Sequence, residues 1–538
     1  MKKLIFLFTI ISVLTSYNKK QKADVIVINS NTYTVNNQFE KAEAFAIKDG
    51  KFIAVGTSKE IQEKYQSENI VDAKNQTIVP GLIDAHCHFF RMGLQQQKVS
   101  LEGTKSYDEV LDKIVAFQKE KNVTFITGRG WDQNDWEVKE FPTKEKLDQL
   151  FPTTPVAVGR VDGHALLVNQ AAIDLSEITK DTKVSGGEII LKDGELTGVL
   201  IDAAMDFIKF PETTKEEAIQ GLLDAQQISF SYGLTTVDDA GINKKTIELI
   251  DSLQQKGNLK MRIYAMVSGD NQQEIDYYIN NGIVKTDRLN VRSFKVYGDG
   301  ALGSRGAAMR KPYSDRDNHF GALIYSPERY QEIARQIAAS NFQMNTHAIG
   351  DSANTWLLKT YKEVLKNEKD RRWRIEHAQI IAPDDFKNFD NILPSVQPTH
   401  ATSDMYWAEE RIGKERMKGA YAFKDLLNTY GKIALGTDFP VEQVNPFLTF
   451  YAATIRKDLN NYPKNGFQME NALTREETLK GMTIWAAYSN FEEDEKGSIE
   501  VGKFADFVIL NQDIMKVKGN NIPKTKAVST FLNGEKVY

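Results

Sequence analysis

Cysteine is almost missing from this chain, since Cys87 is the single cysteine among 538 residues. One cysteine excludes an internal disulfide and any zinc site built from several cysteines. Histidine is also scarce, with seven residues, so a metal site would depend on a few well-placed side chains. The net charge is only −5, and no long basic run follows the N-terminal region, so nucleic-acid binding is not expected.

The N-terminus has the pattern of an export signal. A positively charged start precedes an apolar run, LIFLFTIISVL, which is too short to span a bilayer comfortably. We therefore interpret residues 1–23 as an export segment and expect a periplasmic or membrane-associated protein. The following LTS resembles the start of a lipoprotein box, but Tyr17 stands where the lipidated cysteine would be, so lipidation there is chemically impossible. Cleavage near Ala23 and an uncleaved anchor both stay open.

The rest of the chain divides into strand-rich ends and an alternating middle. With 41% hydrophobic and 26% charged residues, the composition is that of a soluble globular protein with a large core. Short β-type runs with Asp49-Gly50 and Asn533-Gly534 turn signals predict one small β-sandwich domain built from residues 24–80 and 491–538. Residues 81–490 predict a (β/α)₈ TIM-like barrel of the α/β class, with insertions in 101–150 and 165–215.

Eight strand-like runs are expected in the barrel. In chain order they are TIVPGLIDAHCH, PVAVGRVDGH, LTTVDDAG, RSFKVYGDG, FQMNTHAIGD, WRIEHAQI, ILPSVQPTH and GKIALGTDFP. Helix-like stretches such as YQEIARQIAAS and ANTWLLKTYKEVLKN lie between them, with apolar residues at helical spacing.

Several of these runs end in side chains that can bind a metal. The set contains His86, His88, Lys295, His347, His377 and Asp438. A lone histidine beside an apolar run is more often a core or surface residue, but four of the seven histidines end strand-like runs here. Polar residues at the C-terminal ends of barrel strands are typical of a catalytic site, and nitrogen-rich ligands with one carboxylate suit zinc.

The first two histidines illustrate the strand geometry. His86 and His88 are two residues apart, so on a strand both point to the same face, while Cys87 points away and is expected to pack in the barrel wall.

The ordered motifs resemble the amidohydrolase superfamily, and more narrowly the branch that contains N-substituted formamide deformylase. The motifs are PGLIDAHCHF, GRGWDQNDW, RVDGHALLVN, KVYGDGALGSRGAAM, NTHAIGD, RIEHAQ, QPTHATSD, LGTDFPV and GKFADFVIL. The resemblance covers nearly all of residues 24–538 and implies a metal-dependent hydrolase of non-peptide C–N bonds, such as N-acyl or N-formyl amines. Esters or cyclic amides are alternative substrates, and a catalytically silent binding protein on the same fold is the rival class.

The resemblance also implies ligand roles. His86, His88 and Asp438 would bind the more buried of two zinc ions, with other divalent metals as alternatives. His347 and His377 would bind the second ion, and Lys295 would bridge the two as its carbamate. The alternative is a single zinc, with Lys295 in a salt bridge to Asp299 or Asp438.

Three residues are predicted to be catalytic. Asp438 would carry a proton from water to the leaving amine, while His164 and His400 would contact the substrate carbonyl from the ends of strands two and seven. Asp238 and Asp239 are expected to support the metal ligands. The expected partner is a small-molecule substrate, with membrane contact only through an uncleaved signal segment; a homo-oligomer is left open.

Overall fold

The computed structural model describes residues 20–366 and 368–538. Most of the predicted export segment, residues 1–19, lies outside the described residues. Among the described residues, no helix is both long enough and apolar enough to cross a membrane.

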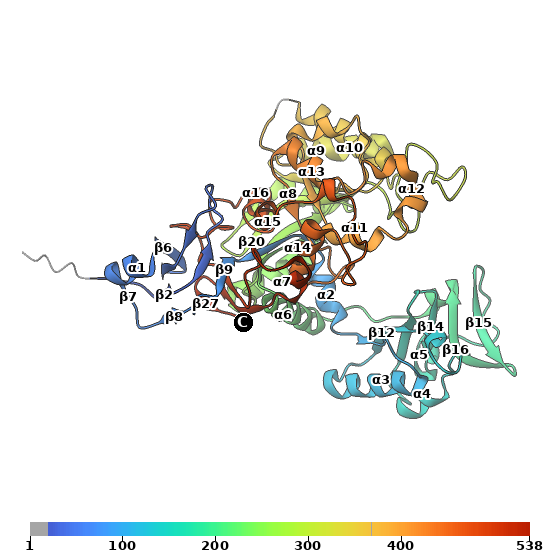
Figure 1. Ribbon diagram of the computed structural model, residues 1–538. Helices are drawn as coiled ribbons and strands as arrows, with labels where there is room; N and C mark the ends of the chain where they lie inside the picture. The colour runs from blue at the N-terminus through green and yellow to red at the C-terminus, as the bar shows by residue number, and fades with distance from the viewer. Residues whose placement is uncertain (1–19, 367) are drawn as a thin grey trace, which may run out of the picture.

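A parallel barrel occupies the centre of the molecule (Figure 1). Its strands follow the order β10 (Leu82–Cys87), β17 (Leu234–Ile242), β18 (Arg262–Ser268), β20 (Leu289–Tyr297), β21 (Gln343–Ala348), β22 (Arg374–His377), β23 (Leu393–Val396) and β24 (Ala434–Leu435), with the short β19 (Val284–Lys285) paired to β20. Each neighbouring pair along the eight-strand path is parallel. The predicted TIM-like barrel is therefore confirmed.

Helices surround this barrel. They are α2 (Phe89–Gln95), α6 (Lys215–Ser231), α7 (Lys244–Gln255), α8 (Gln272–Asn281), α9 (Pro327–Ala338), α10 (Asp351–Leu365), α11 (Pro398–Asp404), α12 (Ala408–Met417), α13 (Phe423–Tyr430), α14 (Pro446–Ile455), α15 (Arg475–Gly481) and α16 (Ile484–Ser489). Their starts follow local chemistry: Thr214 and Glu217 form a capping box at α6, and the Asn243 side chain accepts the Thr246 N–H at α7. The helices predicted near 330–340 and 353–367 correspond to α9 and α10.

The predicted second barrel strand is wrong. Residues 155–164 contribute β13 (Val156–Arg160), which pairs with β12 and β14 in a separate sheet. The run predicted as strand three, β17, is the second barrel strand, and β18 takes third place. The pattern used above predicts no strand at β18, because its sequence RIYAMVS ends in no metal-binding side chain.

The separate sheet forms an insert between α2 and α6. It has the order β11 (Val99–Ser100), β12 (Ile126–Trp131), β13, β14 (Ala165–Val168), β16 (Glu195–Asp202) and β15 (Gly187–Lys192). Helices α3 (Tyr107–Lys121), α4 (Glu145–Leu150) and α5 (Gln170–Leu175) pack on it, and it has apolar clusters of its own. Figure 1 shows this insert standing beside the barrel, to which it is joined next to α2.

Two further sheets come from the ends of the described chain. One has the order β6 (Lys51–Gly56), β5 (Ala44–Lys48), β2 (Val25–Ile28), β8 (Ile70–Asp72), and the other has β27 (Glu535–Lys536), β26 (Ala527–Leu532), β25 (Phe507–Leu510), β9 (Thr77–Pro80), β3 (Asn31–Tyr33), β4 (Lys41–Ala42). Phe45 and Phe52 of the first sheet share an apolar cluster with Phe507 and Phe531 of the second. Helix α1 (Ser58–Lys64) and the pair β1 (Gln21–Lys22) and β7 (Tyr65–Gln66) complete this part.

The chain passes from the terminal sheet into the barrel at Gly81. The predicted first strand splits there into β9 and β10. A Cβ atom at residue 81 would lie 2.2 Å from the Thr235 hydroxyl oxygen, so only glycine allows this close crossing.

Candidate metal centre

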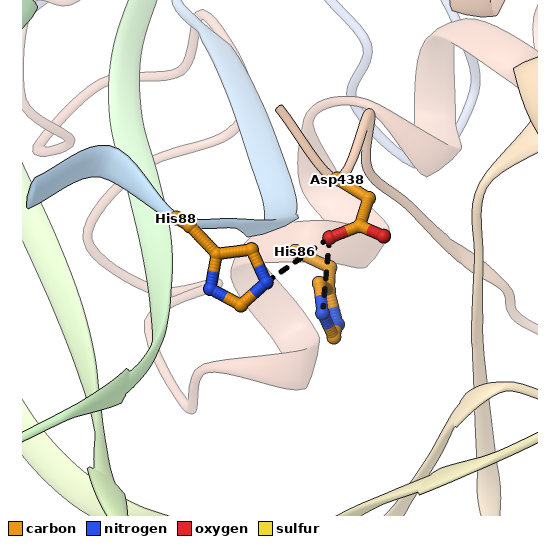
Figure 2. A group of neighbouring side chains, drawn as sticks. All are labelled: His86, His88 and Asp438. Carbon is orange, nitrogen blue, oxygen red and sulfur yellow. Dashed lines mark ion pairs between the residues drawn. The ribbon is translucent and has the colours of Figure 1, made fainter. Parts of the chain in front are cut away.

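Three predicted ligands converge where the first and last barrel strands meet (Figure 2). His86 belongs to β10 and His88 follows it, while Asp438 follows β24. His88 Nε2 lies 3.2 Å from Asp438 Oδ1, and His86 Nε2 lies 3.7 Å from the same oxygen. Their donor atoms are close enough to one another to hold a metal ion.

A second group shares Asp438 with His377 and His400. His400 Nε2 lies 3.7 Å from Asp438 Oδ2, and the rings of His377 and His400 are stacked with centroids 5.8 Å apart. His347 lies beside this group, since its ring centroid is 4.5 Å from that of His377. His400 is not at a strand end as predicted, because β23 stops at Val396 and the histidine lies in α11.

The loop that carries Asp438 is fixed to β10 by hydrogen bonds. The Asp438 N–H donates to the His86 carbonyl at 2.8 Å, and the His88 N–H donates to the Phe439 carbonyl at 2.8 Å. The Asp84 carboxylate accepts the Thr437 N–H at 3.0 Å and the Thr437 hydroxyl at 2.7 Å. These bonds join the last strand segment to the first and hold Asp438 in a left-handed conformation, with φ at 63°.

Lys295 reaches the same centre from β20. Its Nζ atom lies 2.9 Å from His86 Nε2, and the residue is only 1% exposed. Within the described parts of the chain, Lys295 forms no ion pair with Asp299 or Asp438, the two partners considered for a single-zinc site. Burial lowers the pKa of the Lys295 amine, although the carboxylates of Glu376, Asp438 and Asp270 oppose this shift.

Burial also favours neutral histidines at the centre. Burial, the charge of Lys295 and then His86 lower the pKa of His347 from 6.5 to about 3. The pKa of His377 lies well below its usual range, first because of burial and then because of His347 and His86. Burial alone would raise the pKa of Asp438, but the His88 hydrogen bond and the nearby imidazoles lower it. Neutral imidazoles and an ionised carboxylate are the forms that bind metals.

The donor atoms fit a divalent metal. Among the described residues, several buried polar atoms have no hydrogen-bond partner, including His347 Nε2 and His377 Nδ1. Buried polar atoms are rarely left unpaired without a reason, and an ion would satisfy these lone pairs. Imidazole nitrogens with a carboxylate are ligands that zinc and related metals accept.

Comparison with known proteins agrees with this geometry. The protein-family model described as "Amidohydrolase family" matches residues 69–538 of the chain. The chain belongs to the amidohydrolase family. Its members are metal-dependent, so the protein is a metal-dependent hydrolase.

Three relatives illustrate the similarity. This amidohydrolase is 31% identical to "Protein LONG AFTER FAR-RED 3" of Arabidopsis thaliana, over 96% of this chain and 92% of that protein. It is 24% identical to N-substituted formamide deformylase of Arthrobacter pascens, over 96% of this chain and 98% of that enzyme. The crystal structure of an uncharacterized metal-dependent hydrolase from Pyrococcus furiosus has a TM-score of 0.77 and 26% identity, covering 91% of this chain and 100% of that one.

The sequence analysis missed an important carboxylate of this amidohydrolase, Glu376. Its Oε2 atom lies 2.6 Å from His86 Nδ1, and the side chain is fully buried. Arg374 lies two residues earlier on β22, with Nη1 3.8 Å from Glu376 Oε1 and 2.9 Å from Asp238 Oδ2. Asp238 is therefore connected to His86 through Arg374 and Glu376, and its role in supporting the metal ligands stays a prediction. Strand alternation in the RIEH motif was the available signal, since Arg374 and Glu376 must share a face.

Asp299 supports the loop after β21 that follows His347. Its carboxylate accepts the N–H groups of Ala308 at 2.8 Å, Ile349 at 2.9 Å and Gly350 at 2.8 Å. His347 Nε2 lies 3.7 Å from Asp299 Oδ1. Asp299 is therefore engaged with the backbone. Asp239 similarly accepts the Phe90 N–H at 3.1 Å, just after His88.

His164 does not join the group around Asp438. It follows β13 in the insert, and its Nδ1 atom lies 2.7 Å from Asp202 Oδ1, with 74% of the side chain exposed. Its predicted place at a barrel strand end is wrong because β13 belongs to another sheet. Trp131 and Trp136 are buried in the core of the insert. Arg305 pairs with Asp315 at 2.7 Å.

Proposed function

We propose that this amidohydrolase uses zinc to hydrolyse a non-peptide C–N bond of an N-acyl or N-formyl amine. The observation that carries the proposal is the buried set of imidazole nitrogens around Asp438, with lone pairs that no described protein group satisfies. The similarity to N-substituted formamide deformylase supports this bond type. Ester or cyclic amide hydrolysis is the alternative, because the same water activation serves each of these reactions.

Different residues of the chain would carry out proton transfer and substrate binding. A bound divalent metal would supply Lewis-acid activation of water and of the substrate carbonyl. Asp438 would take a proton from the attacking water on a carboxylate oxygen and deliver it to the leaving nitrogen. This delivery matters because a free amide anion is too basic to depart. His400 would donate a hydrogen bond to the substrate oxygen from Nε2, which lies 3.7 Å from Asp438 Oδ2.

Lys295 would be carbamylated and would hold two ions. Its lowered pKa favours the neutral amine, whose nitrogen would add to the carbon of CO₂ and lose a proton to give an anionic carbamate. An unmodified ammonium between two dications would be strongly repelled. Lys295→Ala is expected to lose most activity and at least one metal equivalent, and a short carboxylic acid should restore part of both. Two tightly bound metals and normal turnover in this variant would contradict the bridge.

The test of the function combines metal analysis with a hydrolysis screen. Purified protein supplied with zinc should hold one to two equivalents and should cleave N-formyl and N-acyl amines faster than matched esters or cyclic amides. His377→Ala should lose metal and turnover, whereas His319→Ala should keep both, because His319 contacts the Arg305 carbonyl away from Asp438. Negligible zinc in the supplied protein would refute the metal centre, and metal-loaded protein that cleaves none of these compounds would refute the hydrolase activity.

Export is a separate part of the proposal. The positively charged start and the apolar run at 4–14 support delivery across a membrane. Fractionation of the host should find the protein outside the cytosol, and Tyr17→Cys should become labelled by a fatty-acid probe. Cytosolic protein with an intact N-terminus would contradict export.

A further inference from the structure

A cleft opens directly beside the metal centre. It has a volume of about 270 Å³, and its lining includes His88, Phe90, Arg91, Asp239, Ile242 and Tyr297. Because His88 lines both the cleft and the metal centre, a molecule in the cleft would lie next to the reacting bond. The cleft therefore offers room for a part of the substrate beyond the acyl group.

Arg91 is the unpaired cation of this cleft. It lies on α2, is exposed, and makes no hydrogen bond or ion pair with any residue that the structure describes. A guanidinium stays charged at all physiological pH values and presents a planar fork of donors that matches a carboxylate. An unpaired arginine in a cleft is thus a suitable receptor for an anionic group.

Tyr297 connects the cleft to the metal centre. Its ring centroid lies 5.9 Å from that of His347, and Lys295 Nζ lies 5.3 Å from the Tyr297 ring centroid. The hydroxyl donates to no described protein group. Gly241 lines the cleft opposite this hydroxyl, and a Cβ atom there would lie 3.0 Å from it. The absence of a side chain at Gly241 leaves the hydroxyl accessible.

The acidic groups near the cleft already have partners. Asp239 is buried and accepts the Phe90 N–H at 3.1 Å. Asp270, whose charge acts on Tyr297, accepts the Tyr325 hydroxyl at 3.0 Å. Phe90 and Ile242 add apolar surface to the same lining. The cleft thus combines apolar walls with two free donors.

We propose that Arg91 and Tyr297 bind a carboxylate on the amine part of the substrate. The preferred substrates are then N-acyl or N-formyl amino acids with an apolar side chain, a class narrower than N-acyl amines in general. This assignment rests on the proposed hydrolysis of a C–N bond. Arg91 acts here as a specificity-determining residue, and Tyr297 as a second donor to the same carboxylate.

The test uses two substrates that differ only in the carboxylate, N-acetylphenylalanine and N-acetylphenethylamine. Zinc-loaded wild-type protein should favour the acid. Arg91→Gln should lower kcat/KM for the acid about 10- to 100-fold, the usual range for a hydrogen bond to a charged group, and should change the amine substrate less than about twofold. Arg91→Lys should retain part of the preference, and Tyr297→Phe should lose a smaller part. Arg288→Gln, at the opposite end of the barrel just before β20, is the matched control.

Binding measurements give a readout that does not depend on turnover. Calorimetry should show tighter binding of 3-phenylpropionate than of 3-phenylpropanamide to zinc-loaded wild-type protein, and Arg91→Gln should abolish the difference. Carboxylate binding that survives in Arg91→Gln would be directed by the metal and would overturn the assignment. Equal cleavage of both substrates would overturn it too, while leaving C–N hydrolysis intact. Selective binding of 3-phenylpropionate without cleavage of either substrate would instead contradict the proposed function and support the cleft.

Discussion

Replacing Glu376 by glutamine changes a contact behind a predicted metal ligand without changing the size of the side chain. In the wild type, the carboxylate lies 2.6 Å from His86 Nδ1, both groups are buried, and the contact directs the His86 Nδ1 proton toward Glu376. The other ring nitrogen, Nε2, then carries no proton and faces Lys295 and Asp438, where it can act as a ligand. A glutamine oxygen can accept the same proton, but it carries no negative charge to raise the basicity of the imidazole.

The expected loss can be worked out from this geometry. Changes in the partners of metal-ligating histidines typically cost about 10- to 100-fold in metal affinity. Because Glu376→Gln keeps an acceptor, we expect about a 10-fold loss, equivalent to about 1.4 kcal/mol. Glu376→Ala removes the acceptor as well and should lose about 100-fold, or about 2.8 kcal/mol.

The measurement is a zinc competition titration against a chromophoric chelator, with thermal unfolding of the metal-free protein recorded in parallel. Glu492→Gln is the matched control, because Glu492 is also buried and ion-paired, with Lys496 at 2.6 Å, but lies at no metal ligand. The control should lose stability and keep zinc affinity. Wild-type zinc affinity in Glu376→Gln, or an equal loss in both variants, would refute the reasoning.

The remaining predictions concern proton transfer, acid stability and barrel closure. Asp438→Asn should lower turnover about 100-fold or more, and near-normal turnover at full metal content would remove Asp438 from proton transfer. Burial alone would raise the pKa of Glu492, but Lys496 and Lys285 lower it, so the folded state favours the carboxylate. The stability advantage of wild type over Glu492→Gln should therefore be full above the unfolded pKa of about 4.3, shrink below it, and be lost as the pH falls through the lower folded pKa. Urea unfolding at several pH values would measure this. Gly436→Ala should destabilise the protein by about 1 to 3 kcal/mol and weaken zinc binding, because the new Cβ atom would lie 2.5 Å from the backbone nitrogen of His86. An unchanged thermal unfolding temperature would contradict this.

The strand-like runs that end in a metal-binding side chain are mostly barrel strands, but this pattern alone did not decide the sheet to which a run belongs. Runs that ended in a metal-binding side chain, such as those before His86 and His347, became barrel strands. The run before His164 had the same appearance but pairs in the insert, because local pattern indicates a strand without indicating its sheet. Strand β18 ends in no metal-binding side chain, so this pattern does not predict it.

The surroundings of the ligands were less predictable than the ligands themselves. Asp84 and His86 lie at alternate positions on β10 and His88 comes directly after its end, so a shared face could have been inferred for all three. The contact between Glu376 and His86 joins residues 290 positions apart, and no local spacing reports such a pairing. His400 was predicted at the end of a strand. It lies instead in α11, which begins at Pro398 shortly after β23 ends at Val396.

The insert has a consequence for how the barrel assembles. About 145 residues separate the end of β10 from the start of β17, although these strands are neighbours. Relative to a crossover of about 30 residues, closing so long a loop costs about 1.4 kcal/mol more in chain entropy. Helices α2 and α6, which flank the insert, meet so closely that a Cβ at Gly93 would lie 2.1 Å from the Gly221 oxygen. We therefore expect the insert to fold early, because a folded insert shortens the flexible chain between β10 and β17. Variants in which the insert folds slowly should then also pair β10 with β17 slowly.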